Sequence, residues 1–310
     1  MKLIILGATG FIGSNILPLL EDLGYEIYAV QRKPNQPQDS IASTVHWLMQ
    51  AELLDLPSGL GANAILSIAG GGEPAAFETD PVAALATELK IADFASFLAL
   101  KFQATRIIYL SSGGAIYGDG WKNGHQLAFE ENDTCYPVST YGKCKLASEI
   151  RLAEQLDSIG LLSGLVILRA SNVYGLHYAK IGRQGLINSV VERALDRRPI
   201  TVYGDGLIYR DYLFASDLAY AITKALHAEA GGVFNVATGC SHSILDVIKQ
   251  VEEAVGYCFE KRFEPARGID VKYSALSIRK AQRVLGWSPA VSLKRGIDLV
   301  LKSRRGLPVL

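Results

Sequence analysis

Short apolar runs alternate with longer amphipathic stretches through the N-terminal half of the chain. The alternation repeats at intervals of about 30 residues, which is typical of strand-then-helix units in a parallel sheet. Continuous apolar runs are expected of strands that are buried on both faces. Five runs therefore predict strands: KLIILG (2–7), EIYAVQ (26–31), AILSIAG (64–70), RIIYLSS (106–112) and GLVILRAS (164–171).

The stretches between these runs have the spacing of amphipathic helices. Longer helices are predicted over residues 81–102 and 141–156. A shorter helix is predicted from Phe11 to Leu23, because apolar side chains recur there on one helical face. That face consists of Ile12, Ile16, Leu19, Leu20 and Leu23.

The C-terminal part of the chain has a less regular pattern. Residues 185–197 predict a helix, 199–206 a strand with a turn, and 275–289 a short helix ended by Gly286 and Pro289. We therefore expect an α/β fold of two domains. Residues 1–173 would bind a nucleotide, and residues 174–310 would form most of a smaller α/β substrate domain that interleaves with the first.

The composition is that of a globular protein without bulk charge. Of 310 residues, 49% are hydrophobic and 20% charged, and 31 basic residues balance 31 acidic ones, which disfavours a nucleic-acid partner. The apolar runs are shorter than the roughly 18 residues of a membrane span, and no signal peptide precedes the first strand. Four cysteines without metal-ligand spacing predict free thiols, no metal site and a cytoplasmic location.

A glycine motif, GATGFIG, joins the first predicted strand to the first predicted helix. In this context, glycines allow a tight turn and bring the helix N-terminus close to a pyrophosphate. The motif therefore predicts a dinucleotide site. Its candidate cofactor-binding residues are Gly7, Gly10, Phe11, Ile12 and Gly13.

The end of the second predicted strand bears on which dinucleotide is bound. An acidic residue there would bind the ribose hydroxyls of NAD, whereas a cation would favour the 2′-phosphate of NADP. The strand ends in Gln31, followed by Arg32 and Lys33. NADP is therefore slightly favoured over NAD, with Arg32 as its candidate ligand.

Tyr141 and Lys145 stand four residues apart on a predicted helix, so their side chains share one face. A nearby ammonium favours the phenolate form of a tyrosine, which could then exchange a proton with a substrate hydroxyl during hydride transfer. Tyr257 and Lys261 have the same spacing. The first pair alone follows the glycine motif, the serine-rich strand end and the long helix in order, so it is the predicted catalytic pair.

Six segments in order along the chain together suggest a family: GATGFIG, SSGGAIYG, YGKCK, LRASNVYG, GDGLIYRDY and RVLGWSP. The chain resembles the extended short-chain dehydrogenase/reductases and, within them, the nucleotide-sugar epimerases, dehydratases and reductases. The resemblance implies a Rossmann doubly wound parallel sheet, a nicotinamide cofactor, a nucleotide-diphosphate sugar and a homodimer built on the two long helices. It also implies roles for Tyr141 and Lys145 in catalysis and for Asn172, Arg210 and Arg267 in binding the substrate.

Two positions depart from the pattern of that family. Gly113 stands where a serine or threonine usually supplies a catalytic hydroxyl, so Ser112 is the favoured substitute, with Ser111 as the alternative. Glu88 and Lys90 stand where an asparagine is common on the long helix. The segment GGAIYG also lacks the carboxylate that water elimination requires, and none occurs before Asp119, which disfavours dehydration.

Three functions remain after this comparison. A nucleotide-sugar 4-epimerase that acts through a keto-sugar intermediate is favoured. An NADPH-dependent reductase of a nucleotide-linked 4-keto-6-deoxyhexose is the alternative. A catalytically silent NADP-sensing protein is disfavoured by the presence of both Tyr141 and Lys145.

Overall fold

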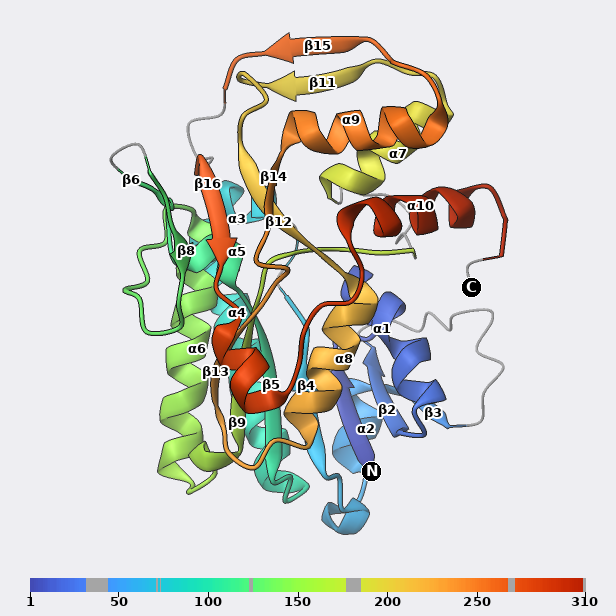
Figure 1. Ribbon diagram of the computed structural model, residues 1–310. Coiled ribbons are helices and arrows are strands. Elements are labelled where there is room, and N and C mark those ends of the chain that lie inside the picture. Colours follow the sequence, from blue (N-terminus) through green and yellow to red (C-terminus); the bar gives the residue numbers. More distant parts are fainter. Residues whose placement is uncertain are drawn as a thin grey trace.

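The computed structural model describes residues 1–31, 44–70, 72, 74–122, 125–176, 185–266 and 271–308 (Figure 1). Arg32 and Arg267, two of the predicted binding residues, lie outside this set, as does Lys33. The larger part of the protein is a seven-stranded parallel sheet with helices on both faces, and the smaller part lies at one end of it.

The large sheet has the strand order β13-β9-β5-β4-β1-β2-β3, and every neighbouring pair is parallel. The chain runs outward from β1 to β3, then crosses back to β4, so the order reverses between β1 and β4. All five predicted strands are present. The strands are β1 (Lys2–Leu6), β2 (Glu26–Gln31), β3 (Val45–Met49), β4 (Ala64–Ser67), β5 (Arg106–Ser112), β9 (Leu165–Ala170) and β13 (Gly232–Val236).

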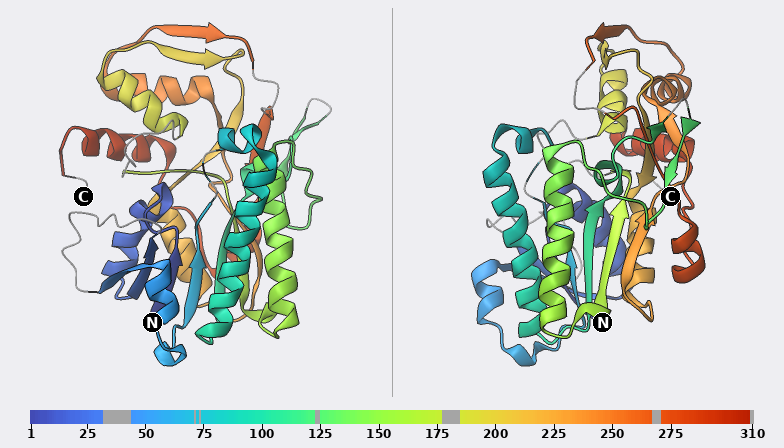
Figure 2. Two further views of the ribbon diagram at one scale, coloured as in Figure 1. Left: turned by 180° about the vertical axis from the view of Figure 1, so that it is seen from behind. Right: turned by 90° about the vertical axis from the view of Figure 1, so that its left-hand side faces the viewer.

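Helices cover the two faces of this sheet in pairs. On one face α1 (Phe11–Asp22) packs against α8 (Ala215–Leu226), and on the other α4 (Pro81–Lys101) packs against α6 (Thr140–Ser158) (Figure 2). Each face has its own apolar core, because successive side chains of a strand point to opposite sides. The described residues contain no helix with the length and hydropathy of a membrane span.

Most of the apolar face that was predicted for the first helix, α1, is confirmed. Ile16 and Leu20 are fully buried against the sheet, and Ile12 and Leu19 pack partly against the same core. Leu23 was wrongly included, because it lies one residue past the helix end and is 48% exposed.

The smaller part combines short strands with three helices, which lie above the large sheet in Figure 1. One sheet has the order β10-β12-β16-β8, with β14 paired to β12, and two further ribbons pair β11 with β15 and β6 with β7. Its strands are β6 (Trp121–Lys122), β7 (His125–Gln126), β8 (Ala128–Phe129), β10 (Asn172–Tyr174), β11 (Ile200–Tyr203), β12 (Tyr209–Phe214), β14 (Ser241–Ser243), β15 (Lys261–Glu264) and β16 (Tyr273–Leu276), and its helices are α7 (Leu186–Leu195), α9 (Ile244–Val255) and α10 (Leu293–Arg304).

Segments from both ends of the chain contribute to each part. The strand β13 joins the large sheet beside β9 although it lies well after residue 173 in the sequence. The proposed boundary at residue 173 and the homodimer remain predictions.

The remaining short helices are α2 (Gln50–Asp55), α3 (Pro74–Thr79), α5 (Gly113–Ile116), η1 (Ser58–Leu60), η2 (Leu162–Gly164) and η3 (Ala281–Leu285).

The short helix predicted within residues 275–289 is confirmed over residues 279–285, and its predicted bounds were too wide. Its first two residues belong to strand β16, and the regular helical segment within it is the π-helical turn η3. Gly286 ends that turn with a φ of +60°, as predicted, because glycine adopts the left-handed conformation without a steric penalty.

Candidate active site

The loop between β1 and α1 has room only for glycine at two of its positions. Gly7 has a φ of +91°, and a Cβ on it would lie 2.6 Å from the backbone nitrogen of Ala69. A Cβ on Gly13 would lie 2.3 Å from the carbonyl oxygen of Ala8. Gly10 caps the helix, and Phe11 and Ile12 form its half-buried first turn. The loop therefore holds the helix N-terminus open to an anionic group, as dinucleotide binding requires.

Tyr141 is held at the start of α6 by contacts with α3. Ser139 caps the helix by accepting from the Gly142 amide at 3.1 Å, and Thr140 donates its amide and hydroxyl to the Glu78 carboxylate at 2.8 and 2.7 Å. The Phe77 ring meets the Tyr141 ring edge-on, with centroids 5.1 Å apart. These contacts fix the ring of a half-buried tyrosine and leave its orientation well defined.

Lys145 lies one turn further along α6 and is buried. Its Nζ is 3.1 Å from Oε2 of Glu88, a fully buried residue of α4, and 5.4 Å from the centroid of the Tyr109 ring. Burial lowers the pKa of Lys145, but Tyr109, Tyr141 and Glu88 together outweigh it and hold that pKa above its ordinary value. Lys145 is therefore an ammonium at neutral pH.

The dinucleotide loop and the tyrosine–lysine pair meet at Ala69, just after β4. Lys145 Nζ donates to the Ala69 carbonyl oxygen at 3.5 Å, and Gly7 packs against the Ala69 amide. Gly70 follows, with its Cβ position 3.7 Å from Lys145 Nζ. Since β4 lies beside β1, where the strand order reverses, this is the place at which open parallel sheets bind dinucleotides.

The segment SSGGAIYG is partly helical rather than a loop throughout. Ser112 ends β5 and precedes the one-turn helix α5. The sequence did not predict this helix, because it begins with two glycines. Ser111 is 4% exposed, and its hydroxyl has no hydrogen-bond partner among the described residues. Ser112 is half-buried. This difference in exposure favours Ser112 as the hydroxyl that can reach a ligand.

Packing explains why position 113 carries no hydroxyl. A Cβ on Gly113 would lie 2.5 Å from Cδ1 of Leu276 and 3.0 Å from the carbonyl oxygen of Arg169. Leu276 comes from β16 and is fully buried, so it cannot move aside without opening the core. A serine at this position would therefore force the Leu276 side chain of the smaller sheet to shift.

Polar groups from distant segments gather around Gly114. Asn172, exposed on β10, has its Oδ1 3.0 Å from the position that a Cβ on Gly114 would take. The Ser274 hydroxyl of β16 lies 3.8 Å from the same position. The structure thus brings the predicted substrate residue Asn172 to the end of β5. Ser274 was missed, because nothing in its local sequence marks it.

A buried network holds the far end of this segment. Arg169 donates to the Glu149 carboxylate at 2.7 Å and to the Tyr117 hydroxyl at 2.8 Å, and Tyr117 donates to Asn235 at 2.9 Å. Burial raises the pKa of Tyr117 to about 12, although Arg169 opposes the shift. Tyr117 therefore remains protonated and acts as a structural donor.

Other polar residues near the site bind backbone groups. Arg210 donates to the carbonyl oxygens of Tyr209 and Val271 at 2.9 and 2.8 Å, and its role toward a diphosphate remains a prediction.

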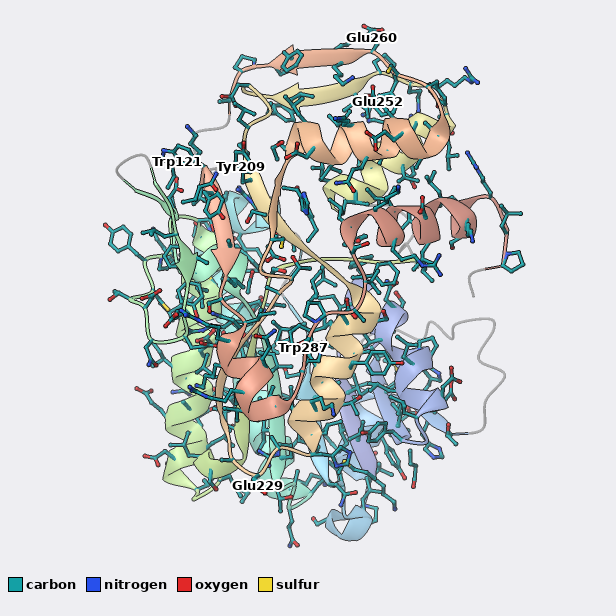
Figure 3. The ribbon with its side chains drawn as sticks, viewed as in Figure 1. Trp121, Tyr209, Glu229, Glu252, Glu260 and Trp287 are labelled. Atoms are coloured by element: carbon teal, nitrogen blue, oxygen red, sulfur yellow. The ribbon has the colours of Figure 1, made fainter. Side chains whose placement is uncertain are left out.

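Asp119 accepts from three backbone amides, those of Trp121, Lys272 and Tyr273. Trp121 and Tyr209 are labelled in Figure 3. The first carboxylate after the glycine-rich segment is thus engaged in holding the fold.

Asp217 holds backbone and side-chain groups of a distant segment. Its carboxylate accepts from the Ala290 and Val291 amides at 3.0 Å each, and its carbonyl oxygen accepts from Trp287 Nε1 (Figure 3). Burial raises the pKa of Asp217, opposed by these hydrogen bonds. The residue fastens the segment before α10 to α8.

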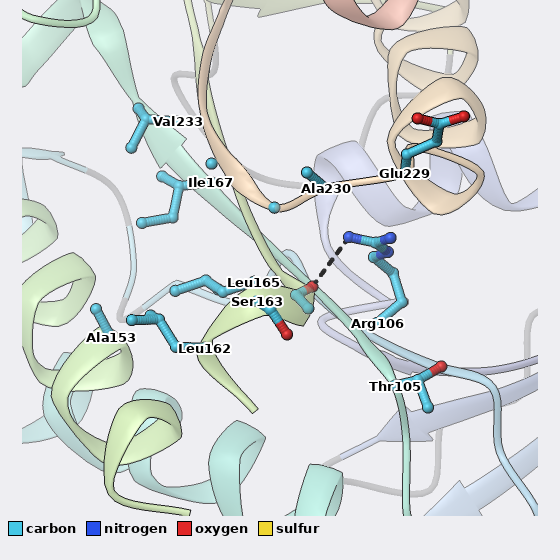
Figure 4. Close-up of a pocket in the computed structure, with 13 residues that line it drawn as sticks. Thr105, Arg106, Ala153, Leu162, Ser163, Leu165, Ile167, Glu229, Ala230 and Val233 are labelled. Carbon is cyan, nitrogen blue, oxygen red and sulfur yellow. Dashed lines mark hydrogen bonds between the residues drawn. The ribbon is translucent and has the colours of Figure 1, made fainter. Parts of the chain in front are cut away.

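A cavity of about 620 Å³ lies at the opposite end of β5, lined by residues that include Arg106, Leu162 and Glu229 (Figure 4). Arg106 donates to the carbonyl oxygens of Gly164 and Ala228. Arg106 and Ser112 are six residue steps apart along the strand, a distance of about 20 Å. The cavity is therefore not part of the candidate active site.

The fold and the site define a class: an α/β dinucleotide-binding protein with a tyrosine–lysine pair at the carboxyl edge of its sheet. The chain belongs to the NAD dependent epimerase/dehydratase family, whose model matches residues 3–237. The predicted family and the predicted fold class are thereby confirmed. Membership of this family also confirms the prediction that the protein is an enzyme.

Four known proteins illustrate the relationship. The chain is 26% identical to a UDP-glucose 4-epimerase of Mycolicibacterium smegmatis, over 96% of each chain. A relative from Methanocaldococcus jannaschii is 32% identical over 65% of this chain and 63% of its own, and a dTDP-4-dehydro-6-deoxyglucose reductase of Escherichia coli is 31% identical over 64% and 61%. The chain thus spans under two thirds of those two relatives. The structure of Thermus thermophilus UDP-glucose 4-epimerase in complex with NAD is 28% identical, with a TM-score of 0.88 over 99% of both chains.

Proposed function

We propose that this protein is an NAD-dependent nucleotide-sugar 4-epimerase. The observation that carries the proposal is the meeting of the glycine loop and Lys145 at Ala69, one helical turn from Tyr141. This geometry suits a nicotinamide beside an acid/base tyrosine. The full-length similarity to UDP-glucose 4-epimerases supports the choice of reaction.

The residues of this chain would divide the work as follows. Tyr141 accepts the proton of the sugar C4 hydroxyl through its phenol oxygen and returns it when the keto sugar is reduced. Lys145 stabilises the phenolate by its charge. Ser112 donates a hydrogen bond to the reacting oxygen, and Asn172 holds the sugar. The glycine loop would hold NAD, and the chemistry that NAD would supply is removal of a hydride from the sugar C4 and its return to the opposite face of the keto sugar.

The choice between NAD and NADP depends on the end of β2. Gln31 is 6% exposed there and carries no charge, so it lacks the carboxylate that would bind the ribose of NAD. That absence supports the slight preference for NADP predicted from Gln31 and Arg32. The NAD complex of the Thermus thermophilus enzyme supports NAD instead. We propose NAD as the working cofactor. Chromatography of the released nucleotide, described below, distinguishes NAD from NADP.

The second candidate is an NADPH-dependent reductase of a nucleotide-linked 4-keto-6-deoxyhexose. The uncharged Gln31 and the similarity to the Escherichia coli reductase favour it. It would use Tyr141 as a proton donor only, and its cofactor would leave after each turnover.

Cofactor content separates the two candidates. The epimerase is expected to release about one NAD per chain on denaturation and to interconvert two UDP-hexoses without added cofactor, because its cofactor is regenerated in each cycle. Chromatography of the released nucleotide and a coupled sugar assay measure both quantities. Protein that is purified without nucleotide and oxidises NADPH only with a keto-sugar nucleotide would exclude the epimerase.

Replacing Ser112 with alanine tests the substitute hydroxyl. We expect kcat to fall about 100-fold, in the range for loss of one oxyanion donor, with little change in the thermal midpoint. Ser111→Ala is the matched control and should leave kcat nearly unchanged, because that hydroxyl is buried. The opposite result for the two variants would assign the role to Ser111.

A further inference from the structure

Glu88 is a buried carboxylate that the proposed mechanism does not use. It is fully buried on α4, and its Oε2 lies 3.1 Å from Nζ of Lys145, which is itself 4% exposed. Taking two charges out of water costs about as much free energy as their attraction returns, so such a pair adds little net stability. The pair therefore calls for an explanation other than stability.

The carboxylate stands where it alters the charge of the predicted catalytic pair. The other carboxylate oxygen of Glu88, Oε1, lies 3.6 Å from the position that a Cβ on Gly70 would take. The carboxylate therefore also lies beside the segment that follows β4. Lys145 and Glu88 together carry no net charge, whereas Lys145 beside an amide would carry a full positive charge. The other titratable groups around the Lys145–Glu88 pair are Tyr141 and Cys144 of α6, Tyr109 of β5 and Glu78 of α3.

We propose that Glu88 is a positioning residue that holds the Lys145 ammonium and offsets part of its positive charge, so that Tyr141 keeps its proton to higher pH. The inference rests on the proposed function only for its consequence in turnover. A tyrosine that keeps its proton is a ready acid for reducing a keto sugar. Its phenolate, which the oxidation step needs, would form less easily.

Removing the charge while keeping the shape tests this role. In Glu88→Gln we expect the tyrosinate absorbance of the cofactor-free protein to appear about one pH unit lower than in the parent protein, since removing a nearby like charge favours the phenolate by about that amount. Spectrophotometric pH titration measures it without any substrate. The change should be absent in a Tyr141→Phe background, which separates Tyr141 from the neighbouring Tyr109.

Three variants make the test independent of folding. Glu88→Asp keeps the charge and should restore the parental titration. Asp93 lies on α4 with Glu88 and forms an exposed ion pair with Arg151 of α6, so Asp93→Asn should not move the titration. If Glu88→Gln does not fold, Glu88→Asn takes its place. An unchanged titration, or a shift that persists without the Tyr141 hydroxyl, would overturn the proposal.

Turnover provides a second and separate readout. The acidic limb of the pH–kcat profile for the oxidation step should move in the same direction and by a similar amount. If no nucleotide sugar is turned over, the proposed function fails, but the absorbance titration still decides the role of Glu88. A moved titration with an unmoved pH–kcat profile would support the effect of Glu88 on Tyr141 and would exclude only its consequence in turnover.

Discussion

Replacing Tyr141 with phenylalanine is expected to lower kcat by about a thousandfold while the protein still folds. The change removes only the phenol oxygen, and acid/base groups of this kind contribute about 10² to 10⁴ in rate. The ring would stay in place because it packs edge-on against Phe77. Steady-state kcat with the preferred sugar nucleotide, together with the thermal midpoint, measures the two effects.

Tyr257→Phe is the matched control for that experiment. Tyr257 has the same spacing to a lysine, Lys261, but its hydroxyl donates to the carbonyl oxygen of Ala194 in the smaller part of the protein. Its loss should therefore lower stability slightly and leave kcat nearly unchanged. Retained turnover in Tyr141→Phe would contradict the mechanism for both the epimerase and the reductase.

Replacing Lys145 with methionine is expected to lower the free energy of unfolding by about 3 to 5 kcal/mol, in addition to its effect on kcat. Removing one partner of a buried ion pair leaves the other charge buried and uncompensated, which is costly. Here that partner is Glu88, which is fully buried. Urea unfolding of the variant and of the parent protein measures the difference.

The double variant Lys145→Met with Glu88→Gln should recover most of that stability, because no buried charge is then left alone. The pH dependence gives a further check. The pKa of Lys145 is raised in the folded protein, so its contribution is fully present below the ordinary lysine value of about 10.5 and is lost only as pH rises above it. In Lys145→Met the buried Glu88 carboxylate has no cation beside it and takes up a proton as pH falls, so the loss of stability should be larger at pH 9 than at pH 6. A double variant as unstable as Lys145→Met would show that the pair is not the cause.

Much of the large sheet could be predicted because its strands are buried on both faces. Such strands must be continuously apolar, and the run RIIYLSS coincides with β5 from Arg106 to Ser112. The smaller part was predicted less well because its strands are short, from two to six residues. The predicted helix began too early there, at residues 275 and 276, since β16 owes its conformation to pairing with β12 and β8.

The sequence by itself indicated the dinucleotide loop, the predicted catalytic pair and the absence of a carboxylate between β5 and Asp119. Each depends on residues close together in the chain, so spacing alone reveals it. Only the tertiary structure decided which side chain crowds Gly113 and what Glu88 contacts. Leu276 fills the space beside Gly113, and Lys145 reaches Glu88 across two packed helices. These partners are far apart in sequence, so their meeting follows from how the sheets and helices pack and not from any local pattern.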